Sequence, residues 1–289
     1  MEFVTAFTSC TTILRGATWN CQQLRFIFDE KRLDSVAHYL SNSFDLVFLQ
    51  EIPPGDSGQY RLRQLVRTMN AGSPLNEPGF SYLLGRETVV LDTTSQLNAI
   101  IYPTSWKILH HASLTSFLHP PIMAWFKRPE SGSSSTTILA ASFHISPSVG
   151  LASSSSASLE PDIPSTPSKS TSTASKTTVQ DRLHLQLSKI VETAKEWEVS
   201  LPSISDQRDL SPRWIIGGDL NVVPDSLPHG LVYTTPKGMP TAIASGRTLD
   251  GFMVDPLTAR THNSVVDLIK TDATLSDHHL VSLILREYP

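Results

Sequence analysis

One stretch constrains the fold more than any other: the run Trp214-Ile-Ile-Gly-Gly-Asp219-Leu-Asn221. Its three large apolar residues are typical of a buried strand, and the glycine pair lets the backbone turn directly afterwards. If the alternation of the strand continues through this turn, Asp219 and Asn221 point the same way at the carboxyl end of the strand. An acid beside an amide can orient a water molecule against a phosphorus atom. The same letters are also typical of a turn in which a side chain caps its own backbone, so both interpretations stay open.

The same arrangement, a polar residue at the end of an apolar run, recurs along the chain. The residues concerned are Asn20, Glu51, His144, Asp250, Asp277 and His278. Each has a structural interpretation, because Asn20 and Asp250 could cap turns and Glu51 could be a solvated loop acid. His144 could be a core histidine bonded to the backbone, and Asp277 could belong to a polar loop. Together, however, these residue types match the needs of metal-assisted phosphodiester hydrolysis.

A hard divalent cation such as Mg²⁺ or Mn²⁺ prefers oxygen ligands. Glu51 is the best single candidate, with Asn20 and Asp277 expected nearby. Such an ion would polarise a phosphoryl oxygen or stabilise the leaving oxygen. Zinc is disfavoured, because the two cysteines and the scattered histidines show no zinc-ligand spacing.

The general base that takes a proton from the attacking water is predicted to be His278. A carboxylate must hold its tautomer and orientation, and Asp250 is the candidate. His144 would give a hydrogen bond or a proton to the phosphate.

Helical and extended patterns alternate along the chain. Helical spacing of apolar residues covers residues 31–40 and 59–70, and a capping box at Thr178-Val-Gln-Asp181 opens a third helix. Strands are predicted at residues 13–19, 44–49, 82–84, 88–91, 98–102, 106–109, 122–126, 136–143, 214–216, 249–254 and 279–285. This order predicts a mixed α/β sandwich, with strands flanked by helices.

At 289 residues and 39% hydrophobic content, the chain can bury a large core in one big domain or two small ones. Residues 146–177 are mostly Ser, Thr, Pro and Ala, so we expect a disordered insertion there, and residues 131–135 are expected to form a hairpin loop. Two cysteines exclude a disulfide scaffold, and we expect Cys21 to be a packed thiol. The net charge of −4 gives no global basic field for nucleic acid. No run reaches membrane-spanning length, and the first residues lack a signal-peptide pattern, so localisation stays open.

Six short motifs stand in a fixed order: Thr18-Trp19-Asn20, Leu49-Gln50-Glu51, His144, Gly218-Asp219-Leu220-Asn221, Leu249-Asp250 and Ser276-Asp277-His278. In this order they resemble the endonuclease/exonuclease/phosphatase superfamily, the deoxyribonuclease I-like proteins. The resemblance covers the whole chain, as a single domain over residues 1–289, except the Ser/Thr-rich insertion. Within the superfamily the chain most resembles the cytolethal distending toxin B subunit. The segments that carry this are Ala17-Thr-Trp-Asn20, Gln50-Glu51-Ile-Pro-Pro54, Leu97-Asn98-Ala99-Ile100-Ile101, Trp214-Ile-Ile-Gly-Gly-Asp219 and Ala244-Ser-Gly-Arg-Thr-Leu-Asp250.

The resemblance implies a four-layer αββα sandwich with a metal site at one mouth of the paired sheets, and Mg²⁺-dependent attack on a phosphodiester. It would make Asp219 and Asn221 orient the water or the phosphate. Two departures concern phosphate binding, because Gln96 and Pro120 stand where toxin B subunits carry arginines. Arginine binds phosphate bidentately, and neither residue replaces that. Basic candidates that remain are Arg86, Lys107, Lys127, Arg128, Lys237 and Arg247.

Three functions are therefore open. The first is an endonuclease that nicks DNA, as the resemblance to toxin B subunits implies, with carrier subunits as possible partners. The second is a phosphatase acting on phosphoinositides on the same fold. The third is a non-catalytic binding module that has lost the arginine contacts. The complete set of acids, amides and histidines favours an enzyme.

Overall fold

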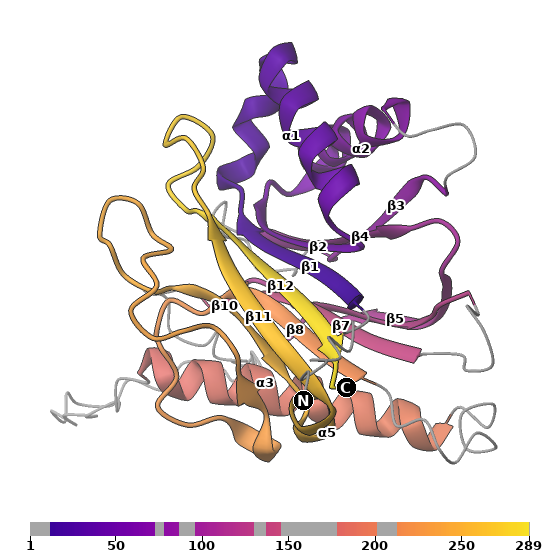
Figure 1. Ribbon diagram of the computed structural model, residues 1–289, viewed down its shortest axis with the longest axis vertical. Helices are drawn as coiled ribbons and strands as arrows, with labels where there is room; N and C mark the ends of the chain where they lie inside the picture. Colours follow the sequence, from indigo (N-terminus) through magenta and orange to yellow (C-terminus); the bar gives the residue numbers. More distant parts are fainter. Residues whose placement is uncertain are drawn as a thin grey trace, which may run out of the picture.

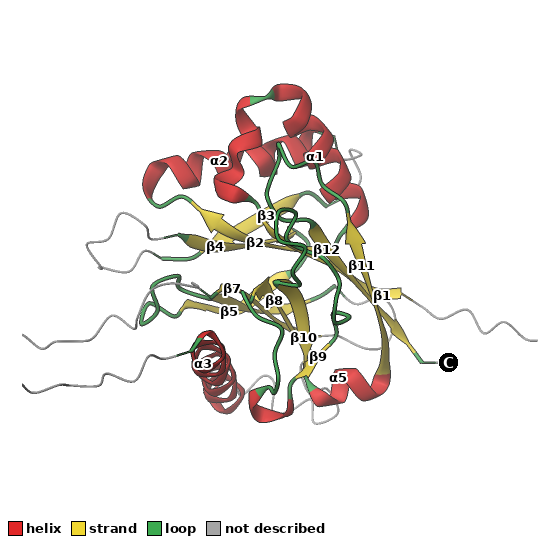
Figure 2. Ribbon diagram, turned by 90° about the vertical axis from the view of Figure 1, so that its left-hand side faces the viewer, coloured by secondary structure: helices red, strands yellow, loops and turns green. Residues whose placement is uncertain are grey.

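Two β-sheets lie face to face at the centre of the molecule, with helices on their outer faces (Figure 2). The computed structural model describes residues 12–72, 78–86, 96–129, 137–145, 178–200 and 213–288. The predicted run at residues 88–91, the predicted loop at 131–135, the insertion at 146–177 and Cys10 lie outside the described residues. None of the described helices is long and apolar enough to cross a membrane.

The first sheet has six strands in the order β11-β12-β1-β2-β4-β3. Within it β1 and β2 run parallel, and the other neighbouring pairs are antiparallel. Helices α1 (Glu30–Ser43) and α2 (Gly55–Ala71) cover its outer face (Figure 1). Its strands are β1 (Thr12–Asn20), β2 (Leu46–Ile52), β3 (Phe80–Leu84), β4 (Leu97–Pro103), β11 (His262–Ile269) and β12 (Leu280–Glu287).

The second sheet also has six strands, in the order β5-β6-β7-β8-β10-β9. Its one parallel pair is β7 and β8, and the long helix α3 (Val179–Ser200) packs on its outer face. The short helix α5 (Pro256–Thr261) follows β10 and begins at Asp255, whose side chain accepts hydrogen bonds from two backbone N–H groups of the first turn. Its strands are β5 (Lys107–Ser113), β6 (Ile122–Lys127), β7 (Thr137–His144), β8 (Arg213–Asp219), β9 (Val232–Tyr233) and β10 (Asp250–Val254).

Apolar side chains fill all three interfaces between the four layers. The helices α1 and α2 bury Leu40 and Leu65 against the first sheet, and α3 buries Leu187 against the second. Between the sheets, Phe48 and Phe252 meet edge to face with ring centroids 5.9 Å apart. Burial of each such side chain stabilises the fold by roughly 1.5–3 kcal/mol. The predicted αββα sandwich is therefore confirmed.

Nearly all the predicted elements that fall on described residues are present. The capping box is confirmed, because Thr178 N–H donates to Asp181 Oδ2 at 2.9 Å and Asp181 N–H donates back to Thr178 Oγ1 at 3.1 Å. Cys21 is a buried free thiol whose Sγ donates to Gln50 O at 3.0 Å, as expected. Strand β11 was not predicted. It lies at the edge of its sheet with most residues half-buried, so neither strict alternation nor a continuous apolar run marks it.

The strand directions bring all the candidate site residues to one mouth of the sandwich. The parallel strands β1 and β2 of the first sheet run toward this mouth, and so do β7 and β8 of the second. Strand β10 begins there, because Asp250, its first residue, lies opposite Asp219 in the register of β10 against β8. On the other side of β8, His144 at the end of β7 also lies opposite Asp219. Strand β12 begins two residues after His278. Polar groups at strand ends therefore meet between the two sheets.

Candidate active site

Asn20 connects the two sheets at this mouth. Its Nδ2 donates to Glu51 Oε1 at 2.9 Å and to Asp219 Oδ2 at 3.0 Å. Strand β1 places Asn20 beside Gln50 of the parallel strand β2, so Glu51 follows on the same side of the mouth. The side chain is almost fully buried. An amide in this place gives hydrogen bonds to two carboxylates that would otherwise only repel each other.

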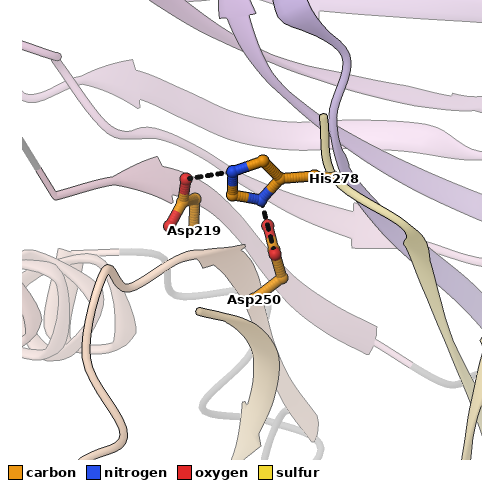
Figure 3. A group of neighbouring side chains, drawn as sticks. All are labelled: Asp219, Asp250 and His278. Atoms are coloured by element: carbon orange, nitrogen blue, oxygen red, sulfur yellow. Dashed lines mark hydrogen bonds and ion pairs between the residues drawn. The ribbon is translucent and has the colours of Figure 1, made fainter. Parts of the chain in front are cut away.

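His278 lies between two carboxylates of the second sheet (Figure 3). Its Nδ1 is 2.7 Å from Asp250 Oδ2, and its Nε2 is 3.9 Å from Asp219 Oδ2. The backbone around it is held from the first sheet, because Trp19 Nε1 donates to His278 O at 3.1 Å. Ser276 Oγ accepts from His278 N–H at 3.0 Å and donates to Asn20 O at 2.6 Å. The Trp19–Asn20 segment therefore holds the backbone of His278, and Asp250 orients its ring.

The two members of this pair have shifted pKa values. Burial alone would lower the pKa of His278, but the hydrogen bond and charge of Asp250 outweigh it and raise this pKa to about 9. Burial and the charge of Asp219 raise the pKa of Asp250. When the ring is neutral, its single hydrogen lies on Nδ1, which donates to Asp250. Nε2 then has a free lone pair and faces Asp219. This is the tautomer that a general base requires.

On the other side of Asp219 lie His144 and Asn221. His144 Nε2 is 3.7 Å from Asp219 Oδ2 and 3.4 Å from Asn221 Nδ2, and burial lowers the pKa of His144. Asn221 Nδ2 also donates to Ile145 O at 2.7 Å. Asp219 Oδ1 accepts from Asn221 N–H at 3.0 Å. One oxygen of Asp219 therefore caps the turn, as one interpretation predicted, and the other oxygen faces the site.

Two site residues have left-handed backbone conformations, with φ of 59° at Glu51 and 54° at Asn221. Such conformations cost on the order of 1–3 kcal/mol each for residues other than glycine. The surrounding structure holds them, since Glu51 lies within β2 and Asn221 is bonded through its backbone and its side chain. Strain of this kind is typical of functional sites.

The charges at the mouth fit a bound cation. Burial raises the pKa of Glu51, and the charges of Asp219 and Asp277 add to this. Asp250 Oδ1 is buried without a hydrogen-bond partner among the described residues. Asp219, Asp250 and His278 each offer a ligand atom, and these three atoms lie within 4.8 Å of one another. Oxygen atoms with excess negative charge suit a hard divalent ion, so the site could hold one.

The structure brings together seven of the eight predicted site residues through direct contacts. These are Asn20, Glu51, His144, Asp219, Asn221, Asp250 and His278. Asp277 is exposed and forms no hydrogen bond or ion pair with them among the described residues, although its charge acts on Glu51 and His278. The group of side chains with the geometry to hold a metal ion is Asp219, Asp250 and His278. The sequence assigned these three residues to catalysis and predicted other residues as the metal ligands.

The places of the two missing arginines have backbone contacts instead. Gln96 N–H donates to His119 Nδ1 at 3.3 Å, and Pro120 O accepts from Asn98 Nδ2 at 2.9 Å. Among the basic candidates, Arg247 lies at the site, where its Nη2 donates to Asn221 O at 3.4 Å. Arg128 lies elsewhere, over the ring of Trp106 between the sheets.

Sequence reasoning did not assign a site role to His119, Ser276 or Trp19. Ser276 and Trp19 stand inside recognised motifs, which was the available signal. His119 lies in the irregular loop between β5 and β6, beside Pro120 at the place of a missing arginine, and only the fold brings its ring next to that of His144, with centroids 4.8 Å apart.

Comparison with known proteins agrees with this architecture. The truncated TDP2 of Caenorhabditis elegans matches with a TM-score of 0.54 and 14% identity, over 94% of this chain and 97% of that one. The human nocturnin catalytic domain with bound sulfate matches with a TM-score of 0.55 and 14% identity, over 97% of each chain. ANGEL2, described as a 2′,3′-cyclic phosphatase in complex with adenosine-2′,3′-vanadate, matches with a TM-score of 0.56 and 12% identity, over 96% and 98%.

At these identities the structural matches show the fold alone. Comparison with curated protein sequences gives no significant match. The family model of the endonuclease/exonuclease/phosphatase proteins, in contrast, matches residues 17–278, which span the site from Asn20 to His278. Members of this family are hydrolases that act on phosphodiester bonds and typically use a divalent metal. The chain belongs to the endonuclease/exonuclease/phosphatase family.

Proposed function

We propose that this protein is a Mg²⁺- or Mn²⁺-dependent phosphodiester hydrolase that nicks DNA. One observation carries the proposal: the Asp250–His278 pair faces Asp219, which Asn20 joins to Glu51. A proton acceptor, a water-binding carboxylate and a metal-binding carboxylate thus lie within one connected network. A purely structural role does not require such a network at the open end of two sheets.

In the proposed mechanism, His278 Nε2 takes a proton from a water molecule held by Asp219 Oδ2. The water oxygen attacks phosphorus, and the bond from phosphorus to the leaving oxygen breaks. Asp250 stabilises the imidazolium that forms, through the hydrogen bond to Nδ1. His144 and Asn221 lie on the opposite side of Asp219, where they can donate hydrogen bonds to the phosphate.

Glu51, Asn20 and Asp277 are the residues that we propose hold the ion, through oxygen atoms. A bound divalent cation supplies positive charge for the phosphoryl oxygen and the leaving oxygen. Because Nδ2 of Asn20 is bonded to Glu51 and Asp219, Asn20 keeps those carboxylates oriented whichever oxygen binds the ion.

DNA is the proposed substrate because the chain resembles toxin B subunits at five segments, and because Arg247 adds a cation beside Asn221. Arg247 is exposed, so its guanidinium can reach a phosphate while it keeps its contact with the loop.

The test is incubation of purified protein with supercoiled plasmid and Mg²⁺, with D219N and H278Q as site variants. His38→Gln is the matched control, because His38 is exposed on α1. We expect wild type and H38Q to nick the plasmid, and each site variant to lose activity by at least about a hundredfold. Chelation of the metal should stop nicking. Parallel assays with RNA and with phosphoinositide vesicles identify other substrates.

Nicking by D219N or H278Q at the wild-type rate would show contamination and contradict the proposal. Phosphate release from phosphoinositides without nicking would replace DNA by a lipid substrate and keep the hydrolytic centre. The charge and hydrogen bond of Asp250 raise the pKa of His278 to about 9. The neutral base becomes more populated as pH rises, so we expect nicking to accelerate between pH 7 and 9.

A further inference from the structure

His119 is a buried residue at the mouth to which the hydrolytic mechanism assigns no role. It is 6% exposed and lies three residues before the start of β6. Its ring stacks on that of His144, with centroids 4.8 Å apart and planes 10° from parallel. Because His144 Nε2 is 3.7 Å from Asp219 Oδ2, His119 lies one ring further from the water-binding carboxylate. It is therefore on the side of the site away from His278.

The hydrogen bond from Gln96 fixes the tautomer of His119. The backbone N–H of Gln96 donates to Nδ1 at 3.3 Å, so Nδ1 must carry a lone pair. The neutral ring then carries its hydrogen on Nε2. Among the described residues no group accepts a hydrogen bond from this atom, and it is not one of the fully buried unpaired atoms. An N–H donor without a partner among the described residues is thus present in the ring beside His144.

His119 is also neutral. Burial lowers its pKa to about 4, and the neighbouring His144 contributes to this. A neutral stacked ring cannot give the bidentate charged contact of an arginine. It can give one directional hydrogen bond, and its stacking on His144 holds it in place for that bond.

We propose that His119 is a substrate-binding residue that donates one hydrogen bond from Nε2 to a non-bridging oxygen of a nucleic-acid phosphate at the site. This inference rests on the proposed function and adds a residue to its binding surface. It also gives a neutral contact at a place where the chain has no arginine. The competing explanation is that His119 only fills space beside His144.

Two substitutions separate these explanations. His119→Phe keeps an aromatic ring that can stack on His144 but removes the N–H donor. His119→Gln keeps an N–H donor and removes the ring. If His119 only fills space beside His144, the phenylalanine variant should bind substrate like wild type. If His119 donates a hydrogen bond to the phosphate, the glutamine variant should bind like wild type and the phenylalanine variant more weakly.

The first measurement is equilibrium binding, which needs no turnover. In the H278Q background with Mg²⁺, the affinity for a fluorescein-labelled oligodeoxynucleotide is measured by anisotropy. Loss of a hydrogen bond to a charged group weakens binding by about tenfold to a hundredfold. We expect such a loss for H278Q/H119F and less than about a threefold change for H278Q/H119Q.

The second measurement is kinetic, with the single variants and plasmid as substrate. We expect H119F to raise KM by a similar factor and to change kcat by less than about threefold, because the contact is a binding contact. Equal melting temperatures of the variants show that the fold is kept.

Three results decide the matter. Unchanged affinity and KM in H119F, while wild type nicks DNA, would overturn the inference alone and leave the proposed function standing. Absence of DNA binding by the H278Q parent, together with absence of nicking by wild type, would overturn both. Weaker binding in H119F that H119Q restores supports the inference.

Discussion

In the proposed function, binding of the metal ion depends most on Glu51. Its carboxylate accepts a hydrogen bond from Asn20, and the charges of Asp219 and Asp277 add to burial in raising its pKa. Excess negative charge at a buried mouth destabilises the folded protein unless a cation is present. The residue-scale consequence is that ion binding should stabilise the fold.

We predict that Mg²⁺ raises the melting temperature of the wild-type protein and not that of Glu51→Gln. A ligand that binds only the folded state stabilises it by about 2.7 kcal/mol at one hundred times its dissociation constant. Without added metal, E51Q should melt at or above the wild-type temperature, because a repelling charge is gone. Differential scanning fluorimetry at increasing Mg²⁺ measures this.

The matched control is Glu30→Gln, because Glu30 lies exposed in the first turn of α1. E30Q should respond to Mg²⁺ like wild type. An equal Mg²⁺ response in E51Q would show that the ion binds without Glu51, with the group of Asp219, Asp250 and His278 as the alternative site.

The Asp250–His278 pair predicts a pH dependence of stability. The folded pKa of His278 is about 9, above its ordinary value of 6.5. The raised pKa of His278 therefore stabilises the folded protein at pH 6.5, and this contribution is lost as pH rises to about 9. We expect the free energy of unfolding of the ion-free protein to fall by up to ~3 kcal/mol over that window.

Asp250→Asn should reduce this slope, because the negative charge that raises the pKa of His278 is lost while burial remains. Urea denaturation at pH 6.5, 7.5 and 9 measures the effect. Titration of the His278 ring by NMR, assigned by its absence in H278Q, reports the pKa directly. A pKa of about 9 that persists in D250N would refute the assignment of its cause.

At the scale of elements, the close contact between β7 and β8 fixes the position of Asp219. A Cβ added at Gly218 would lie 2.1 Å from Phe143 O, a backbone atom of β7. Such an overlap cannot be relieved by a rotamer change, so the two parallel strands must separate. Because His144 and Asp219 end these strands opposite each other, their separation would also widen the site.

We predict that Gly218→Ala destabilises the protein by about 3 kcal/mol or more and lowers nicking. Gly72→Ala is the control, because its added Cβ would meet no atom closer than 3.9 Å. G72A should change stability by less than about 1 kcal/mol. Chemical denaturation of both variants tests the prediction, and equal stability of G218A and wild type would contradict the strand spacing described above.

At the scale of the whole molecule, residues 146–177 connect the second sheet to helix α3 and lie outside the described residues. Strand β7 of the second sheet ends at His144, and helix α3, which packs on that sheet, begins at Val179. Both elements contribute buried side chains to the core. The segment has few apolar residues to add to that core. We propose that it is an insertion in one single domain.

Replacement of residues 147–176 by a Gly/Ser linker of about a dozen residues should therefore leave the melting temperature within about 3 °C of wild type. Nicking activity should also persist. The control replaces residues 181–197 of α3 with Gly/Ser, which removes buried side chains such as Leu187 and Trp197 and should abolish cooperative unfolding. Loss of cooperative unfolding in the first variant would show that the segment belongs to the core.

Much of the fold was predictable because its strands are unusually apolar. All eight residues of β7 are buried, since sheet and helix layers cover both of its faces. Edge positions gave weaker signals, and β11, half-buried along its length, was missed. The candidate residues were found for a related reason: at the mouth, a buried strand ends in a polar side chain, and this change is visible in the letters.

The sequence by itself determined which side chains can carry chemistry and which runs are strands, because burial on both faces and turn chemistry are local properties. Only the tertiary structure decided how those side chains meet. Asn20 and Asp219 are distant along the chain, as are Asp250 and His278, yet each pair is within hydrogen-bond distance. The stacking of His119 on His144 depends on the register of β6 against β7 and on a loop without regular pattern. Hydrogen bonds and ring stacking require positions fixed to fractions of an ångström, and the packing of two sheets sets those positions.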